Sequence, residues 1–174
     1  MGSIKNLDKI AEGSLCVLDT NILLYAEQGV STQAQRLLRR VERGEILGVL
    51  PQPVWQELTH KLMLAEALTL GAVKGGNLAR QLSGKPGVVK RLKLYKEKVQ
   101  ALMTLGCKFE ACTQTDLVEG AFRLQGRYGL LTNDSVILAV ALRLDADALV
   151  SADERFRAVE DIEVYSPSDI SLTP

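Results

Sequence analysis

The stretch LCVLDTN at residues 15–21 decides the fold class of this 174-residue chain. Its first four residues, Leu15 to Leu18, are all apolar, which is typical of a short strand buried on both faces. Asp19 follows directly, and the next residues predict a short helix from Asn21 to Glu27. A buried strand that ends in an aspartate and passes into a helix indicates an α/β protein with a parallel sheet.

The same alternation continues outward along the chain. Short apolar runs predict further strands at 46–50, 107–111, 148–150 and 162–165, and helical spacing predicts helices at about 31–44, 54–65, 88–102, 113–127 and 132–144. We expect Thr113 or Thr115 to cap the fourth of these helices, and Thr132 or Asn133 the fifth. Strands that alternate with helices predict a three-layer α/β/α sandwich with a parallel central sheet, similar to a Rossmann fold.

Length and composition restrict the class of protein further. A chain with 47% hydrophobic and 24% charged residues buries a real core, which excludes a disordered protein. Three cysteines and one histidine exclude a disulfide framework and a four-ligand zinc site. We expect residues 1–13 to be an N-terminal extension and residues 14–174 a single domain, with a basic helical insertion at about 71–105. The sequence shows no signal core and no membrane-spanning run, so a cytoplasmic protein without a membrane partner is predicted.

Charge is unevenly distributed, although 21 basic and 21 acidic residues balance. Residues 71–108 hold nine lysines and arginines against one acid, whereas residues 109–174 hold five against twelve. The basic segment could bind RNA phosphates beside the acidic residues, with Lys90, Arg91 and Lys93 as the candidates. It could equally be the solvated face of an amphipathic helix or face a protein partner, and the sequence leaves these interpretations open.

Four acidic residues stand where an α/β fold collects functional groups. Asp19 and Asp153 follow predicted strands, Asp134 lies in the first turn of a predicted helix, and Glu57 lies early in the helix after the second strand. Because parallel strands end at one edge of the sheet, these carboxylates are expected to converge there. Each also has a purely structural interpretation, as a turn residue, a helix cap or a solvated side chain.

A cluster of this kind requires a cation. Two unit charges 4 Å apart repel by about 4 kcal/mol at an effective dielectric near 20. Ligation by oxygen atoms alone selects hard ions, so Mg²⁺ or Mn²⁺ is predicted. Such an ion supports hydrolysis of a phosphodiester. Asn21 and Ser151, each next to a strand-end acid, could orient a ligand as supporting residues.

The ordered motifs VLDTN, PVWQEL, LLTNDSVILAVAL and LVSADERF resemble those of PIN-domain nucleases, and most closely the toxin subunits of VapBC-type toxin–antitoxin pairs. The resemblance covers about residues 14–166. It implies that Asp19, Glu57, Asp134 and Asp153 form the catalytic and metal-binding site, supported by Asn21 and by Ser151, where threonine is commoner.

The resemblance also implies an activity and partners. The expected protein is a PIN-like, Mg²⁺- or Mn²⁺-dependent endoribonuclease that acts on RNA, with a possible antitoxin protein and a possible second copy in a homodimer. A haloacid-dehalogenase-like phosphatase fits less well, because Asn21 stands where that family has its second aspartate. A PIN module that has lost catalysis and binds RNA or protein stays open as the alternative.

Overall fold

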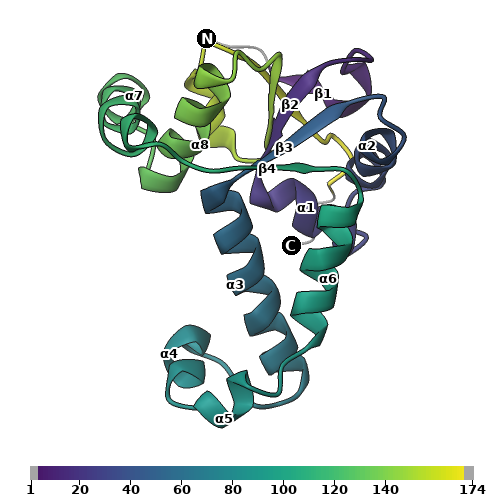
Figure 1. The fold of residues 1–174 in the computed structure, drawn as a ribbon, viewed down its shortest axis with the longest axis vertical. Coiled ribbons are helices and arrows are strands. Elements are labelled where there is room, and N and C mark those ends of the chain that lie inside the picture. Colours follow the sequence, from purple (N-terminus) through teal and green to yellow (C-terminus); the bar gives the residue numbers. More distant parts are fainter. Residues whose placement is uncertain (1–3, 171–174) are drawn as a thin grey trace.

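The computed structural model describes residues 4–170 and is built on a six-stranded, wholly parallel sheet (Figure 1). The strand order is β1-β6-β5-β2-β3-β4. The strands are β1 (Lys5–Asn6), β2 (Leu15–Leu18), β3 (Leu47–Pro51), β4 (Lys108–Glu110), β5 (Ala148–Val150) and β6 (Glu163–Ser166). The predicted parallel sheet is confirmed.

Helices cover both faces of the sheet. In Figure 1, α7 and α8 lie on one side of the strands and α1 and α2 on the other, which confirms the α/β/α sandwich. The α-helices are α1 (Thr20–Glu27), α2 (Thr32–Glu42), α3 (Gln52–Thr69), α4 (Leu78–Ser83), α5 (Pro86–Val89), α6 (Leu94–Thr104), α7 (Ala121–Tyr128) and α8 (Thr132–Arg143). Short 3₁₀ turns form η1 (Leu7–Lys9) and η3 (Glu154–Ala158), and η2 (Asp116–Gly120) is a π-helical turn. Within residues 4–170, no helix combines the length and the apolar character needed to cross a membrane.

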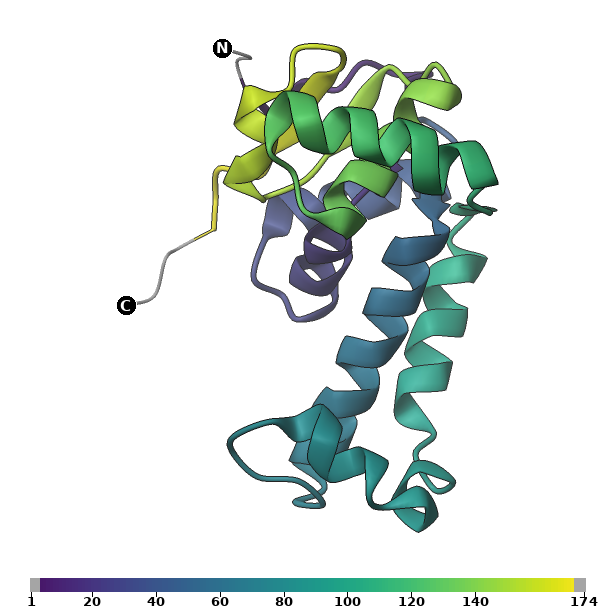
Figure 2. The ribbon, with the colours of Figure 1, turned by 90° about the vertical axis from the view of Figure 1, so that its left-hand side faces the viewer.

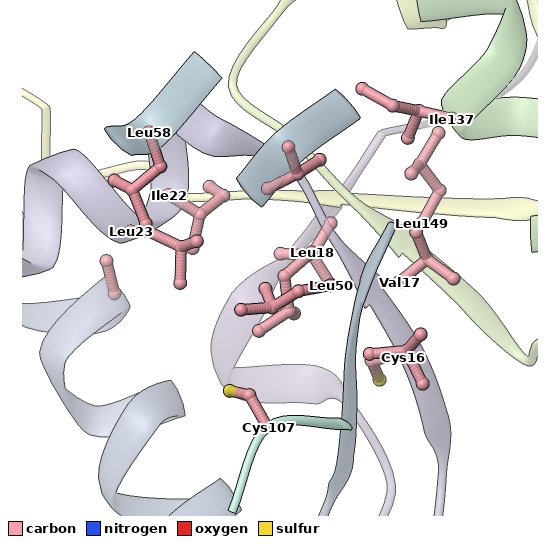
Figure 3. Packing of buried hydrophobic residues seen from close by; sticks show 14 of the residues in the cluster. Cys16, Val17, Leu18, Ile22, Leu23, Leu50, Leu58, Cys107, Ile137 and Leu149 are labelled. Carbon is pink, nitrogen blue, oxygen red and sulfur yellow. The ribbon is translucent and has the colours of Figure 1, made fainter. Parts of the chain in front are cut away.

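Strand β2 lies at the centre of the core because its side chains have no polar group to satisfy. Cys16, Val17 and Leu18 are fully buried. They pack among apolar side chains of neighbouring strands and helices, including Leu50 and Leu149 (Figure 3). The burial of this run on both faces fixes where β2 ends, and therefore where Asp19 lies.

An arm of two long helices projects from the sheet. Helices α3 and α6 pack against each other along the arm, and α4 and α5 form its far end (Figures 1 and 2). The single helix expected over residues 88–102 is interrupted between α5 and α6. The carboxylate of Glu66 accepts hydrogen bonds from the backbone N–H groups of Lys93 (2.9 Å) and Tyr95 (2.9 Å), so a helix start is stabilised there from α3.

Two local features differ from the sequence expectation. Strand β1 was not predicted, because it is two polar residues long and forms only by pairing with β6. The N-cap of α8 is Leu131, not Thr132 or Asn133, which already lie inside the helix and so have no capping geometry. The expected Thr113 cap is confirmed, since its hydroxyl accepts from the backbone N–H of Asp116 at 3.1 Å.

Candidate active site

The strand order places Asp19 and Ser151 side by side. The chain continues from β2 to β3 on one side, while β5 pairs with β2 on the other, so the order of connection reverses between β2 and β5. Asp19 donates its backbone N–H to the carbonyl of Val150 (2.9 Å), directly across this switch point. Functional groups of open parallel sheets collect at such a point, at the carboxyl edge.

Asp19 is the buried centre of the site, with 6% of its surface exposed. One carboxylate oxygen accepts from the backbone N–H of Thr20 (2.6 Å). The other accepts from the Ser151 hydroxyl (2.6 Å) and the Asn21 amide (2.8 Å). Burial raises the pKa of Asp19, and the neighbouring charges of Asp134 and Glu57 raise it further, although the hydrogen bonds from Ser151 and Thr20 oppose this rise. The supporting positions predicted for Asn21 and Ser151 therefore contact Asp19 directly.

Glu57 reaches the same edge from α3. This helix begins directly after β3, and Pro53 in its first turn favours a helix start. The hydroxyl of Thr20 donates to one oxygen of Glu57 at 3.1 Å, which links it to Asp19 through one residue. Lys61, one turn further along α3, pairs with the other oxygen at 2.7 Å.

Asp134 and Asp153 are joined by one arginine. Arg155 in η3 contacts Asp134 at 2.9 Å and Asp153 at 2.9 Å through its two terminal nitrogens. Burial raises the pKa of Asp134; Arg155 lowers it, while Asp153 and Glu57 raise it. Asp153 also caps η3 by accepting from the backbone N–H of Arg155 (2.9 Å), so its structural interpretation holds alongside any functional one.

All four predicted acids thus belong to one connected network. Thr20 links Glu57 to Asp19. Ser151 links Asp19 to Asp153, because its hydroxyl donates to Asp19 and accepts from the backbone N–H of Asp153 (3.0 Å). Arg155 then links Asp153 to Asp134.

The network fits a hard divalent cation by its chemistry, since its acidic donors are all carboxylates. Within residues 4–170, however, no three acidic, histidine or cysteine side chains are grouped so that they could hold a metal ion. The cations that neutralise the acids in this arrangement are the chain's own, Arg155 and Lys61.

Sequence reasoning missed Thr20, Lys61 and Arg155. Lys61 could have been found, because it follows Glu57 at the i,i+4 spacing that brings opposite charges together on a helix. Arg155 had no such signal, since its reach to Asp134 depends on how η3 sits beside α8. Asp116 is a further buried acid, but it pairs with Arg143 (3.0 Å) and lies outside the network.

The basic candidates lie elsewhere. Lys90, Arg91 and Lys93 follow α5 at the far end of the arm, away from the acids. The arm leaves the sheet where β3 ends, so the acids lie at its base and the basic residues at its tip (Figures 1 and 2).

The fold and this site define an α/β/α domain with a carboxylate network at the switch point of a parallel sheet. Comparison with protein families gives the same class: the model of the PIN domain matches residues 16–162. The chain belongs to the PIN domain family, as the sequence motifs indicated. No curated protein matches the chain.

Solved structures of toxin–antitoxin complexes share the fold. A structure of VapBC2 from Rickettsia felis, bound to a DNA fragment from their promoter, matches with a TM-score of 0.57 and 15% identity over 87% of this chain and 98% of that one. A toxin–antitoxin complex from Klebsiella pneumoniae matches with a TM-score of 0.56 and 20% identity, over 84% of this chain and 94% of that one. A structure of VapBC-1 from nontypeable Haemophilus influenzae matches with a TM-score of 0.50 and 16% identity, over 86% of this chain and 96% of that one.

Proposed function

We propose that this protein is a divalent-metal-dependent endoribonuclease that hydrolyses phosphodiester bonds of RNA. The observation that carries the proposal is the network that links Asp19, Glu57, Asp134 and Asp153 on one carboxyl edge of the sheet. Membership of the PIN domain family supports nuclease chemistry over other uses of such an edge.

Each acid has a role in this proposal. Asp19, Asp134 and Asp153 would hold Mg²⁺ or Mn²⁺, and Glu57 would be a further ligand or would orient the attacking water. When bound, such an ion neutralises charge on the phosphate oxygens and makes water more acidic. Asn21 and Ser151 hold the Asp19 carboxylate in one orientation, because each donates a hydrogen bond to the same oxygen. Burial keeps Asp19 away from competing water.

A second candidate function rests on Arg155. This side chain already occupies oxygens of Asp134 and Asp153, and no three acids of the described chain are grouped as metal ligands. That arrangement favours a PIN module that has lost catalysis and binds RNA or a protein. Against it stands the presence of all four acids, since a scaffold gains nothing from collecting negative charge.

The protein would act as the toxin of a toxin–antitoxin pair, with an antitoxin protein as its partner. The similar solved structures are toxin–antitoxin complexes, and this supports the assignment. A homodimer and a cytoplasmic location stay predictions.

Cleavage of a mixed pool of structured RNA tests the proposal. The purified protein would be incubated with Mn²⁺, with Mg²⁺ and with EDTA, beside Asp134→Asn prepared identically. We expect metal-dependent cutting that the substitution abolishes, with the fold intact by circular dichroism. Cutting that persists in the variant would reject this site. RNA binding without cutting under either metal would favour the lapsed module.

A further inference from the structure

The tip of the arm concentrates positive charge, and its nearest acids in the sequence are Glu66 and Glu97, which flank it. Between Glu66 and Glu97 the sequence contains no aspartate or glutamate. The same stretch contains seven exposed basic residues, which we call the tip surface: Lys74, Arg80, Lys85, Lys90, Arg91, Lys93 and Lys96. In the part of the chain that the structure describes, none of the seven takes part in an ion pair. Such a surface attracts a polyanion.

The backbone of the tip is held by local contacts. Leu82 and Leu92 are buried beneath it. The amide of Gln81 donates to the carbonyls of Lys74 (3.1 Å) and Gly75 (2.6 Å) and accepts from the backbone N–H of Lys74 (3.0 Å). These bonds close the loop between α3 and α4. These contacts define the backbone positions of the basic residues, whose side chains extend into solvent.

The kind of polyanion follows from what the tip lacks. Proteins that bind single-stranded nucleic acid usually offer exposed aromatic rings on which bases stack. Residues 67–94 contain no phenylalanine, tyrosine, tryptophan or histidine, and the next aromatic residue, Tyr95, is buried. A surface with cations and no stacking platform suits the backbone of a base-paired helix, which proteins recognise by shape and phosphate contacts.

The distance to the acids determines how such a helix would lie. From Glu57 to Thr69, α3 extends over 12 residues, which is about 18 Å at a rise of about 1.5 Å per residue. At the B-form spacing of about 3.4 Å per nucleotide along each strand, that distance corresponds to roughly five nucleotides, and the more compressed A-form helix of RNA requires somewhat more. Lys61 lies on this path, one helical turn from Glu57.

We propose that the tip surface binds the phosphate backbone of base-paired RNA, roughly five or more nucleotides from the bond placed at the acids. The second half of this statement rests on the proposed nuclease function, whereas the first does not. The arm then selects substrates by length and pairing: an RNA needs a stem that reaches from the base of the arm to its tip.

Equilibrium binding tests the surface independently of catalysis. The probes are an RNA duplex of about 20 base pairs and a single strand of the same length, titrated at several salt concentrations in EDTA. The variant carries Lys90→Gln, Arg91→Gln and Lys93→Gln. The matched control carries Lys9→Gln, Arg39→Gln and Arg123→Gln, three exposed residues that form no ion pair within residues 4–170 and lie away from the tip.

We expect the tip variant to bind duplex at least 10-fold more weakly than the wild type, and the control to differ by less than about 2-fold. The slope of log affinity against log salt should fall by about 2 to 3 for the tip variant, at about 0.9 per lost phosphate contact. Equal binding of duplex by tip variant and control, or a wild type that prefers the single strand, overturns the proposal. Equal binding by tip variant and control would leave the tip as a surface for an acidic protein partner.

Cleavage separates this proposal from the proposed function. If the protein cuts RNA, the tip variant should lose rate on a long paired substrate and keep its rate on an oligonucleotide too short to reach the tip. Equal loss on both substrates contradicts the length selection. If no RNA is cut by any form, the nuclease proposal fails, while the duplex binding above still decides the role of the tip.

Discussion

Arg155→Ala should destabilise the metal-free protein through the acids that it bridges. The guanidinium pairs with Asp134 and Asp153, each at 2.9 Å, and its side chain is 50% exposed. Half-exposed pairs are worth at most about 1 kcal/mol each. Removal of the arginine also leaves two partly buried carboxylates to repel each other. Together these effects give a loss of about 2 kcal/mol, or about 4–8 °C in Tm for a chain of this size.

The matched control is Arg157→Ala in the same turn, η3. Among the described residues, Arg157 forms an ion pair with Glu154 alone, and both side chains are mostly exposed. Its loss should therefore cost less than about 0.5 kcal/mol. The measurement is urea and thermal unfolding of both variants in EDTA. In a second series, Mn²⁺ should raise the Tm of Arg155→Ala by more than it raises the Tm of the wild type. The reason is that the two carboxylates freed by the substitution no longer have a competing cation. Equal stability of the two variants in EDTA would refute this account of the site.

Two further predictions concern carboxylates outside the network. The first is Asp169, whose pKa partial burial alone would raise. Hydrogen bonds from Ser31 and from the residues that begin α2 outweigh burial and lower the pKa of Asp169 to about 2. The stability that the Asp169 carboxylate contributes is therefore fully present above its ordinary pKa of 3.8 and is lost as the pH falls through about 2. When the free energy of unfolding is measured against pH, Asp169→Asn should show a smaller loss of stability at acid pH than the wild type. The second is Asp116, which is 3% exposed and pairs with Arg143. Arg143→Met should lower the free energy of unfolding in urea by about 3–5 kcal/mol, because the buried Asp116 would keep an unpaired charge. Adding Asp116→Asn should recover part of this loss, and no recovery would contradict the pairing.

Much of the fold follows from local sequence because the strands that form its centre are continuous apolar runs. Leu15 to Leu18 predicts both the strand and the position of Asp19, and the topology of parallel sheets then brings the other acids to the same edge. Strand β1 carries no such signal, since two polar residues become a strand only by pairing with β6.

The parts that sequence could not predict depend on contacts between distant residues. Glu66 starts α6 from 27 positions away, which no periodicity reveals. The pairing of Arg155 with Asp134 likewise depends on how η3 packs, not on spacing. The basic segment was identified by charge, but its place at the far end of the arm follows from the direction in which α3 leaves the sheet.

One consequence of the long helix α3 is mechanical. Glu57 lies five residues from the helix start at Gln52, and the helix ends 17 residues from that start, at Thr69. With a rise of about 1.5 Å per residue, these distances are about 7.5 Å and about 26 Å. A rigid helix that tilts at its base is a lever with a ratio of roughly three to one. A load that moves the far end of the arm by about 3 Å therefore shifts Glu57 by about 1 Å. In the proposed nuclease, a displacement of that size at an active-site group would change the rate by about 100-fold.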